Sequence, residues 1–224
     1  MTHLQEALKE LKQSLTEMAE LVQSQIKKSI CSLMDQDEDL ANEVVFNEKR
    51  VNAMELSIDK DCENIFALLA PVAHDMRLVF ATLKINGDLE RIGDYADGIA
   101  KLVLLGNKEF DPQLISNLQL KSMYDTAYSM LQDVTKAYCD DDSKLARKVF
   151  SKDLQLNAIN QAASDVVSSY CRDNIDRINQ ALLLLSIVRK LERVGDHITN
   201  IAEEIIFFKE AKILKHGNKG EERP

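Results

Sequence analysis

The sequence predicts an all-α protein built from two tandem antiparallel three-helix bundles that are related by pseudo-twofold symmetry. Three observations support this fold class. The 224 residues include three prolines, seven glycines and no tryptophan, a composition typical of long helices with few turns. Apolar residues recur at steps of three and four, and the two-residue alternation of a β-strand is absent from the sequence. One stretch of the chain also occurs twice.

The repeated stretch is Leu83 to Ala100, LKINGDLERIGDYADGIA, which returns 102 positions later as LSIVRKLERVGDHITNIA, Leu185 to Ala202. Nine of the eighteen aligned positions are identical, where chance gives about one. An internal repeat indicates one supersecondary unit that is used twice. The chain is therefore expected to consist of two related halves.

Three helices are expected in the first half. The first begins at Thr2, a suitable N-cap, and runs to the acidic turn at residues 35–39. The second covers residues 40–69. Its apolar residues recur in sevens, as in the seam of a helical bundle, at Val44, Val51, Ile58 and Ile65. The third covers residues 71–105, from a proline that a helix interior excludes to a glycine that favours a helix end.

The second half repeats this order. Its helices are expected over residues 112–140, over residues 143–171, and from residue 173 or 174 to about residue 214. An acidic turn again separates the first two of them. The domain boundaries that follow are a first repeat at residues 1–107, a second at residues 108–215, and a charged, glycine-containing tail at residues 216–224 that is expected to be disordered.

Composition and charge limit the classes of partner. The net charge of −9 disfavours nucleic acid and anionic membrane surfaces, because both bind clustered Lys and Arg. No apolar run approaches the roughly 20 residues that span a bilayer, and no leader segment precedes Leu4. We therefore expect a cytoplasmic protein that is at most peripheral to membrane complexes. The four cysteines lack the spacing of a zinc site and are expected to be small buried side chains.

Each copy of the repeat has an apolar face and an opposite acidic face when it is plotted at about 100° per residue. Glu90 and Asp94 in the first copy, like Glu192 and Asp196 in the second, are four residues apart and lie on adjacent turns of one outward face. Like charges at this spacing repel by roughly 0.2–0.5 kcal/mol, so we expect a cation to offset the repulsion. Oxygen ligands without sulfur suit magnesium, calcium, manganese or carboxylate-held iron, with zinc also open.

Neighbouring residues supply further oxygen atoms. The additional candidate metal ligands are Asp97, Glu203 and Asn200, together with the pairs Glu48/Asn52 and Asp153/Asn157 on the adjacent helices. The first of these pairs belongs to a polar stripe that continues through Glu55 and Asp59. An acidic face opposite an apolar face is also what an ordinary solvated helix surface looks like. The recurrence of the same residues in both halves favours the cation site.

Two other residue types recur inside the repeat. Arg91 and Arg193, each next to a glutamate of the acidic pair, are expected to pair with acids on a neighbouring helix. A glycine inside a helix costs roughly 1 kcal/mol relative to alanine. Gly93 and Gly195 are therefore expected at places where two helices approach closely.

No pattern in the sequence argues for catalysis. A di-iron bundle needs Glu-x-x-His motifs on facing helices, whereas His197 follows Glu192 by five residues and has Tyr95 as its counterpart in the first half. A structural role is favoured for His197. Phosphate-binding glycine loops, nucleophile elbows and zinc spacings are absent from the sequence.

At these motifs the chain resembles the PhoU family of regulators of bacterial phosphate uptake, over nearly its whole length. The segments that carry the resemblance are Pro71-Val-Ala-His-Asp75-Met-Arg77, Asp88-Leu-Glu-Arg-Ile-Gly-Asp94, Leu191-Glu-Arg-Val-Gly-Asp196-His, Asn200-Ile-Ala-Glu203 and Lys212-Ile-Leu-Lys-His216. The resemblance implies two three-helix bundles with surface metal clusters held by Glu/Asp-x-x-x-Asp motifs, which map to the two acidic pairs. This chain has Asn52 and Asn157 at the second place of each partner pair, and an amide oxygen is a weaker ligand than a carboxylate.

The resemblance also implies a function. It predicts a non-enzymatic adaptor that binds the ATPase of the phosphate ABC transporter and a sensor histidine kinase, and that represses the phosphate-starvation response when phosphate is plentiful. A homodimer is expected. The carboxylate faces alone permit an alternative, which is a metal-storage or metal-dependent catalytic bundle, and a helical scaffold without metal is the third possibility.

Overall fold

The computed structural model describes residues 2–107 and 110–212, and every regular element in these ranges is a helix. The elements in chain order are α1 (His3–Asp35), α2 (Glu38–Leu69), α3 (Ala73–Leu105), α4 (Pro112–Asn117), α5 (Leu120–Asp140), α6 (Ser143–Arg147), α7 (Val149–Asp173), the short 3₁₀ helix η1 (Ile175–Arg177) and α8 (Ile178–Glu210). The predicted all-α fold class is confirmed.

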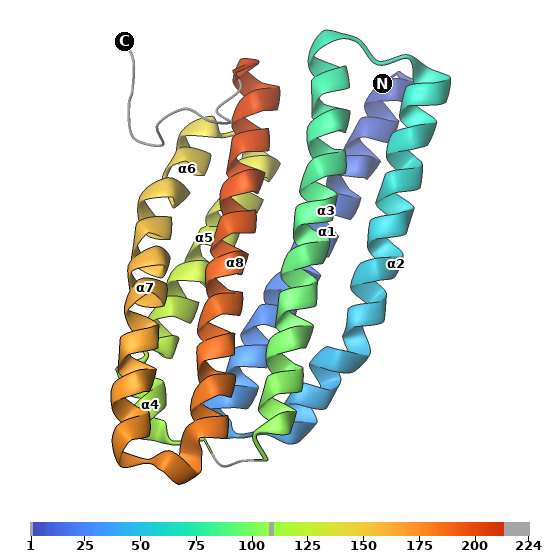
Figure 1. The fold of residues 1–224 in the computed structure, drawn as a ribbon. Coiled ribbons are helices and arrows are strands. Elements are labelled where there is room, and N and C mark those ends of the chain that lie inside the picture. Colours follow the sequence, from blue (N-terminus) through green and yellow to red (C-terminus); the bar gives the residue numbers. More distant parts are fainter. Residues whose placement is uncertain (1, 108–109, 213–224) are drawn as a thin grey trace.

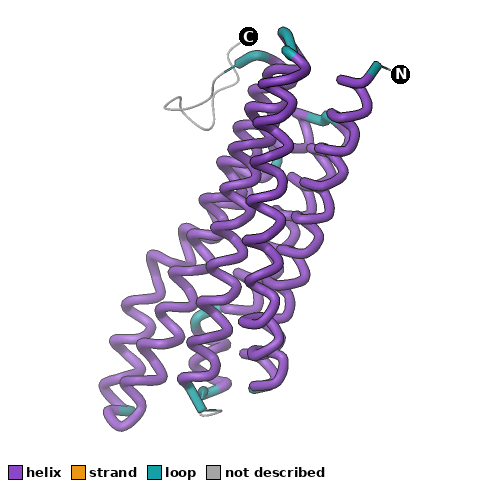
Figure 2. Tube along the Cα trace, turned by 90° about the vertical axis from the view of Figure 1, so that its right-hand side faces the viewer, coloured by secondary structure: helices purple, strands orange, loops and turns teal. Residues whose placement is uncertain are grey.

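The helices form two antiparallel three-helix bundles that lie side by side (Figure 1). Helices α1, α2 and α3 make the first bundle, and α5, α7 and α8 make the second, with α6 leading into α7. The central contact joins α3 to α8, which run in opposite directions, and α1 also packs against α5. Seen from the side, the molecule is long and narrow along the helix axes (Figure 2).

The apolar faces predicted from the repeat are buried. Leu89, Ile92 and Ile99 of α3 and Leu191 and Ile198 of α8 are at most 2% exposed. They belong to one hydrophobic core that includes residues of both bundles. The two halves therefore stabilise each other, and the division at residues 107 and 108 stays a prediction.

Side-chain caps start several helices. Thr2 and Gln5 form a capping box at α1, in which each side chain bonds the other's backbone N–H. The carboxylates of Asp37, Asp111 and Asp142 accept hydrogen bonds from the first backbone N–H groups of α2, α4 and α6. Asp37 and Asp142 lie in the acidic turns that the sequence places between helices.

The helix predicted over residues 112–140 is broken at Gln119, which adopts a left-handed conformation with φ of 52°. The flanking Leu118 and Leu120 are both at most 2% exposed. In one unbroken helix these two side chains would point about 200° apart, so one would face solvent. The break allows both leucines to enter the core.

Smaller differences occur at other boundaries. The helix predicted over residues 143–171 is interrupted at Lys148 and extends to Asp173. The last helix begins at Ile178, because Asn174 leaves helical geometry and a 3₁₀ turn follows it. That helix ends at Glu210, before the predicted residue 214, since Ala211 is left-handed. The predicted disordered tail at residues 216–224 lies outside the described residues.

Candidate functional site

Two glycines bring the helices of the site together. A methyl carbon placed on Gly93 of α3 would lie 3.0 Å from Cγ1 of Val51 on α2. A methyl carbon on Gly195 of α8 would collide with the side chain of Leu156 on α7 and lie 3.0 Å from Oδ1 of Asp153. The predicted close approach at both glycines is confirmed, and it places the polar stripes of α2 and α7 beside the acidic pairs of α3 and α8.

We call the resulting surfaces the first and second acidic faces. The first acidic face consists of Glu48, Asn52, Glu55 and Asp59 on α2 with Glu90, Asp94 and Asp97 on α3. The second acidic face consists of Asp153 and Asn157 on α7 with Glu192 and Asp196 on α8. The four repeat carboxylates are partly exposed, with side-chain exposure of 20% and 39% for Glu90 and Asp94 and of 18% and 36% for Glu192 and Asp196.

The arginine beside each acidic pair has nearly the same geometry in the two halves. Arg91 Nε lies 3.6 Å from Glu90 Oε2 and its Nη1 lies 3.3 Å from Asp94 Oδ2. The matching distances from Arg193 to its own glutamate and aspartate are 3.7 and 3.1 Å. These ion pairs stay within one helix, although Arg91 also acts on the neighbouring helix, where its positive charge opposes the rise that burial causes in the pKa of Glu55 on α2.

Negative charge accumulates on both faces. Burial, followed by repulsion from Asp94, raises the pKa of Glu90 above its ordinary value, and Glu55 and Glu48 of α2 add to the rise. Burial, followed by repulsion from Asp196, raises the pKa of Glu192 in the same way. Burial and then Asp59 raise the pKa of Glu55. The arginines offset this charge only in part, so each face favours an added positive charge.

The two asparagines hold carboxylates in place. Asn52 donates a short hydrogen bond from Nδ2 to Glu48 Oε1, and Asn157 donates one from Nδ2 to Asp153 Oδ2 at 2.9 Å. In each case the amide nitrogen is the atom that contacts a carboxylate of the acidic face. Metal ligation by Asn52 and Asn157 stays a prediction.

Two candidate ligands lie deeper than the sequence predicts. Asp97 is 8% exposed and Asp153 is 3% exposed, so these carboxylates do not face outward. Asp97 is held by Lys101 on the next turn, with 2.6 Å between Nζ and Oδ2. This hydrogen bond, followed by the attraction of the same carboxylate, raises the pKa of Lys101. Glu203 of α8 is partly exposed and takes the repeat position of Lys101, while Thr199 takes that of Asp97.

Glu55 and Asp59 join the first acidic face although the candidate ligand set omitted them. Asp59 accepts a hydrogen bond at 2.8 Å from Nδ2 of the fully buried Asn86 on α3. The signal in the sequence was the helical spacing of four, three and four residues that runs from Glu48 through Asn52 and Glu55 to Asp59. The second half has Asn160 and Ser164 at the corresponding places, so this extension belongs to the first half alone.

The acidic faces offer oxygen donors to a cation but no preformed metal site among the described residues. Within residues 2–107 and 110–212, no three His, Cys, Asp or Glu side chains already converge closely enough to hold a metal ion. Two buried oxygens beside the first acidic face, Asn86 Oδ1 and Asp97 Oδ1, have no hydrogen-bond partner among the described groups. Oxygen donors and raised carboxyl pKa values fit a hard cation. Asn86 lies eleven residues before Asp97 on α3, roughly 16 Å along the helix, so the two oxygens belong to opposite ends of the face. A closed ligand shell there would need side-chain rearrangement.

His197 contacts neither acidic pair. Its Nδ1 lies 2.7 Å from Oδ1 of Asp88 on α3, and Asn200 donates a hydrogen bond to the same oxygen at 3.2 Å. Both residues therefore join α8 to α3 across the centre of the molecule. This arrangement agrees with the structural role favoured for His197.

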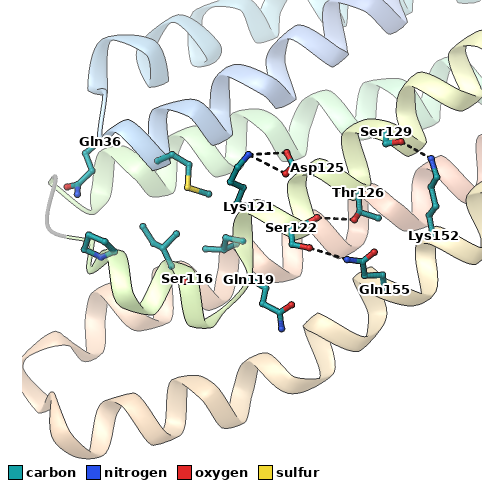
Figure 3. A pocket seen from close by; sticks show the side chains of 14 residues that line it. Gln36, Ser116, Gln119, Lys121, Ser122, Asp125, Thr126, Ser129, Lys152 and Gln155 are labelled. Carbon is teal, nitrogen blue, oxygen red and sulfur yellow. Dashed lines mark hydrogen bonds and ion pairs between the residues drawn. The ribbon is translucent and has the colours of Figure 1, made fainter.

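A separate cavity of about 880 Å³ lies near the end of α1, between α4, α5 and α7 (Figure 3). Its polar side chains bond one another: Gln155 donates to Ser122 at 3.1 Å, and Lys152 lies 2.7 Å from Ser129 Oγ. No residue of either acidic face lines it.

No helix within the described ranges combines the length and apolar character needed to cross a membrane.

The comparisons with known proteins match this arrangement. The family model of the PhoU domain matches twice, over residues 15–103 and 120–205, and each match contains one acidic pair. A phosphate-specific transport system accessory protein PhoU homolog from Burkholderia sp is 32% identical over 203 residues, which cover 90% of this chain and 86% of that protein.

Two solved structures share the fold. The crystal structure of PhoU from Pseudomonas aeruginosa matches with a TM-score of 0.89 and 29% identity, covering 94% of this chain and 100% of the other. The crystal structure of the phosphate transport system regulatory protein PhoU from Streptococcus pneumoniae matches with a TM-score of 0.86 and 27% identity, covering 94% and 99%. These names describe accessory and regulatory proteins, as expected for a chain that is not an enzyme. The chain belongs to the PhoU family.

Proposed function

We propose that this chain is an accessory protein of a phosphate-specific transport system and acts without catalysis of its own. The observation that carries the proposal is the match to the PhoU family, which includes both halves and both acidic pairs. In this function the chain acts in the cytoplasm, binds the ATPase of the phosphate ABC transporter and a sensor histidine kinase, and represses phosphate uptake and the starvation response when phosphate is plentiful.

The charge distribution supports docking on basic protein surfaces. Residues 1–107 contain 19 of the 37 acidic side chains and 11 of the 28 basic ones, so nearly all of the net charge of −9 belongs to the first half. Complementary charge accelerates association and excludes partners of the wrong sign. The first bundle is therefore the surface that we assign to the more basic partner.

The test is deletion of the gene and complementation on a plasmid. Loss of the protein should leave the transporter and a secreted phosphatase expressed in phosphate-rich medium, and the wild-type gene should restore repression. Complementation with Leu154→Asp, a change at an exposed position of α7, serves as the control for expression and folding. Repression that persists in the deletion strain would reject the proposed function.

A second proposal concerns the acidic faces. We propose that each face binds a divalent or trivalent cation, with iron, zinc, manganese, magnesium and calcium as the candidates. In the first half the cation would be held by Glu90, Asp94 and Asp97 of α3 with Glu48 and Glu55 of α2. In the second half it would be held by Glu192, Asp196 and Asp153. The support is the raised pKa of both glutamates, and for the first face the buried Asp97 Oδ1, which has no hydrogen-bond partner among the described groups. The bound cation would supply positive charge that joins neighbouring helices.

Elemental analysis of the purified protein, followed by equilibrium dialysis against each metal, tests this proposal. The wild type should retain metal, and the variant with Glu90→Gln, Asp94→Asn, Glu192→Gln and Asp196→Asn should lose it. Loss of metal with repression intact would separate cation binding from the adaptor function. Equal metal content in both proteins would reject the sites.

We also propose that the chain forms a homodimer. Large apolar side chains remain exposed where α2 turns into α3 and where α7 turns into α8. Leu68 is 76% and Val72 is 71% exposed at the first turn, and Ile175 is 73% exposed at the second. Exposed apolar clusters are typical of interaction surfaces. Sedimentation equilibrium of the wild type and of Leu68→Asp with Ile175→Asp tests the proposal, and a wild type that is monomeric at high concentration would contradict it.

A further inference from the structure

The first acidic face contains a positive charge that the second lacks. Lys101 lies one turn beyond Asp97 on α3, and its Nζ is 2.6 Å from Asp97 Oδ2. At the corresponding positions of α8 the chain has Thr199 and Glu203. The Thr199 hydroxyl donates to the backbone oxygen of Asp196 at 2.8 Å, so it brings no charge to the second face. The duplication has thus given the two faces opposite charges at one repeat position.

The geometry around Lys101 shows a partly satisfied carboxylate. Asp97 is 8% exposed, and its Oδ2 is engaged by the ammonium group. Its Oδ1 is buried and has no hydrogen-bond partner among the described groups. A buried ionised carboxylate needs a counter-charge, because removing it from water is costly. Lys101 supplies that charge from the edge of the face, where its side chain is 59% exposed.

We propose that Lys101 is a built-in counter-ion of the first acidic face, which competes there with a bound cation and makes the two faces unequal in cation affinity. The inference rests on the proposed cation binding. An ammonium group on a flexible, largely exposed stem can withdraw into water when another cation takes its place. The first face therefore keeps Asp97 neutralised without metal. In the second half the position that corresponds to Lys101 is occupied by Glu203, two turns beyond Asp196 on α8, so a negative charge replaces the positive one.

Mn²⁺ binding, measured by isothermal titration calorimetry on the full chain, tests the inference one face at a time. In the Glu192→Gln/Asp196→Asn background only the first face should bind. Lys101→Gln should there raise the affinity for Mn²⁺ about tenfold, since it removes a nearby positive charge. In the Glu90→Gln/Asp94→Asn background, Lys101→Gln should change nothing and Glu203→Lys should weaken binding at the second face by a similar factor.

A matched control is available on α5. Lys121 pairs with Asp125 at the same four-residue spacing, at 3.2 Å, and lies on neither acidic face. Lys121→Gln should leave Mn²⁺ affinity unchanged, which excludes an effect of net charge alone. Thermal unfolding gives a second readout. Without metal, Lys101→Gln should lower the unfolding temperature, because Asp97 loses its partner, and Mn²⁺ should raise it by more than in the wild type.

The outcomes separate the two proposals. If the first face binds Mn²⁺ and Lys101→Gln leaves both the affinity and the metal-induced gain in unfolding temperature unchanged, Lys101 is not a competing counter-ion and cation binding stands. If neither the wild type nor Lys101→Gln binds Mn²⁺ at either face, the inference is overturned, and the cation sites are overturned with it if equilibrium dialysis also finds none of the other candidate metals bound.

Discussion

Asp88 and His197 join the two halves of the molecule: Oδ1 of Asp88 on α3 lies 2.7 Å from Nδ1 of His197 on α8. The positions related by the repeat are Lys190 and Tyr95, and there the Lys190 ammonium lies 5.7 Å from the centroid of the Tyr95 ring. One pair thus uses a hydrogen bond and its symmetry mate uses a cation–π contact. The pseudo-twofold axis relates the positions while the chemistry differs.

The first prediction concerns this contact. A double-mutant cycle with Asp88→Asn and His197→Gln should give a coupling energy of about 1 kcal/mol, because the hydrogen bond is partly buried. Urea unfolding followed by circular dichroism measures it. The same cycle on the exposed pair Lys121 and Asp125 should give a coupling close to zero. Equal coupling at the two sites would show that Asp88 and His197 do not stabilise the interface.

The second prediction uses three glycines. Gly93→Ala and Gly195→Ala should each lower the free energy of unfolding by about 1–3 kcal/mol, because the new methyl group meets a buried side chain. A methyl group on Gly87 meets nothing within 4 Å. Gly87→Ala should therefore raise the free energy of unfolding by about 0.5–1 kcal/mol through helix propensity. Chemical denaturation of the three variants checks the order. A stabilised Gly195→Ala would mean that α7 and α8 separate easily.

The third prediction concerns pH. Burial first, and then the neighbouring aspartate, raises the pKa of Glu90 and Glu192 in the folded protein above the ordinary value of 4.5. The folded state then binds more protons than the unfolded state, so stability falls as pH rises from about 4.5 through the raised pKa. Glu90→Gln with Glu192→Gln should therefore raise the unfolding temperature at neutral pH.

Thermal unfolding at several pH values in the presence of a chelator provides the measurement. The gain from the double variant should shrink as pH falls through the raised pKa and disappear below 4.5, where both glutamates are protonated in either state. Glu20→Gln on the exposed surface of α1 controls for the loss of a charge. A gain that stays constant across this range would contradict the electrostatic explanation.

The fourth prediction concerns the break between α4 and α5. Gln119 has φ of 52°, a conformation that costs about 1 kcal/mol for residues with a side chain and little for glycine. Gln119→Gly should therefore leave stability unchanged or raise it by up to about 1 kcal/mol. Gln161→Gly, within α7, should lower the free energy of unfolding by about 1 kcal/mol. A large loss at Gln119 would mean that its side chain supports the break.

The helices, the apolar faces, the duplication and the acidic pairs were predictable from sequence, because each depends on spacing within a single helix. Periodicity identified Leu89, Ile92 and Ile99 as core residues, and they are buried. The two glycines were interpreted correctly for the same reason. A glycine inside a helix indicates that another helix packs closely there, whichever part of the sequence that second helix belongs to.

Contacts between helices were decided only by the tertiary structure. The partner of His197 is Asp88, 109 residues away, and nothing in the local pattern indicates it. Periodicity places Asp97 with the outward acidic residues, yet its side chain is buried and Lys101 neutralises it. The break at Gln119 also escaped prediction, because it arises from the burial of leucines on both sides. Spacing along the chain determines which residues share a face, whereas the depth of a face and the charges opposite it depend on which helices pack together.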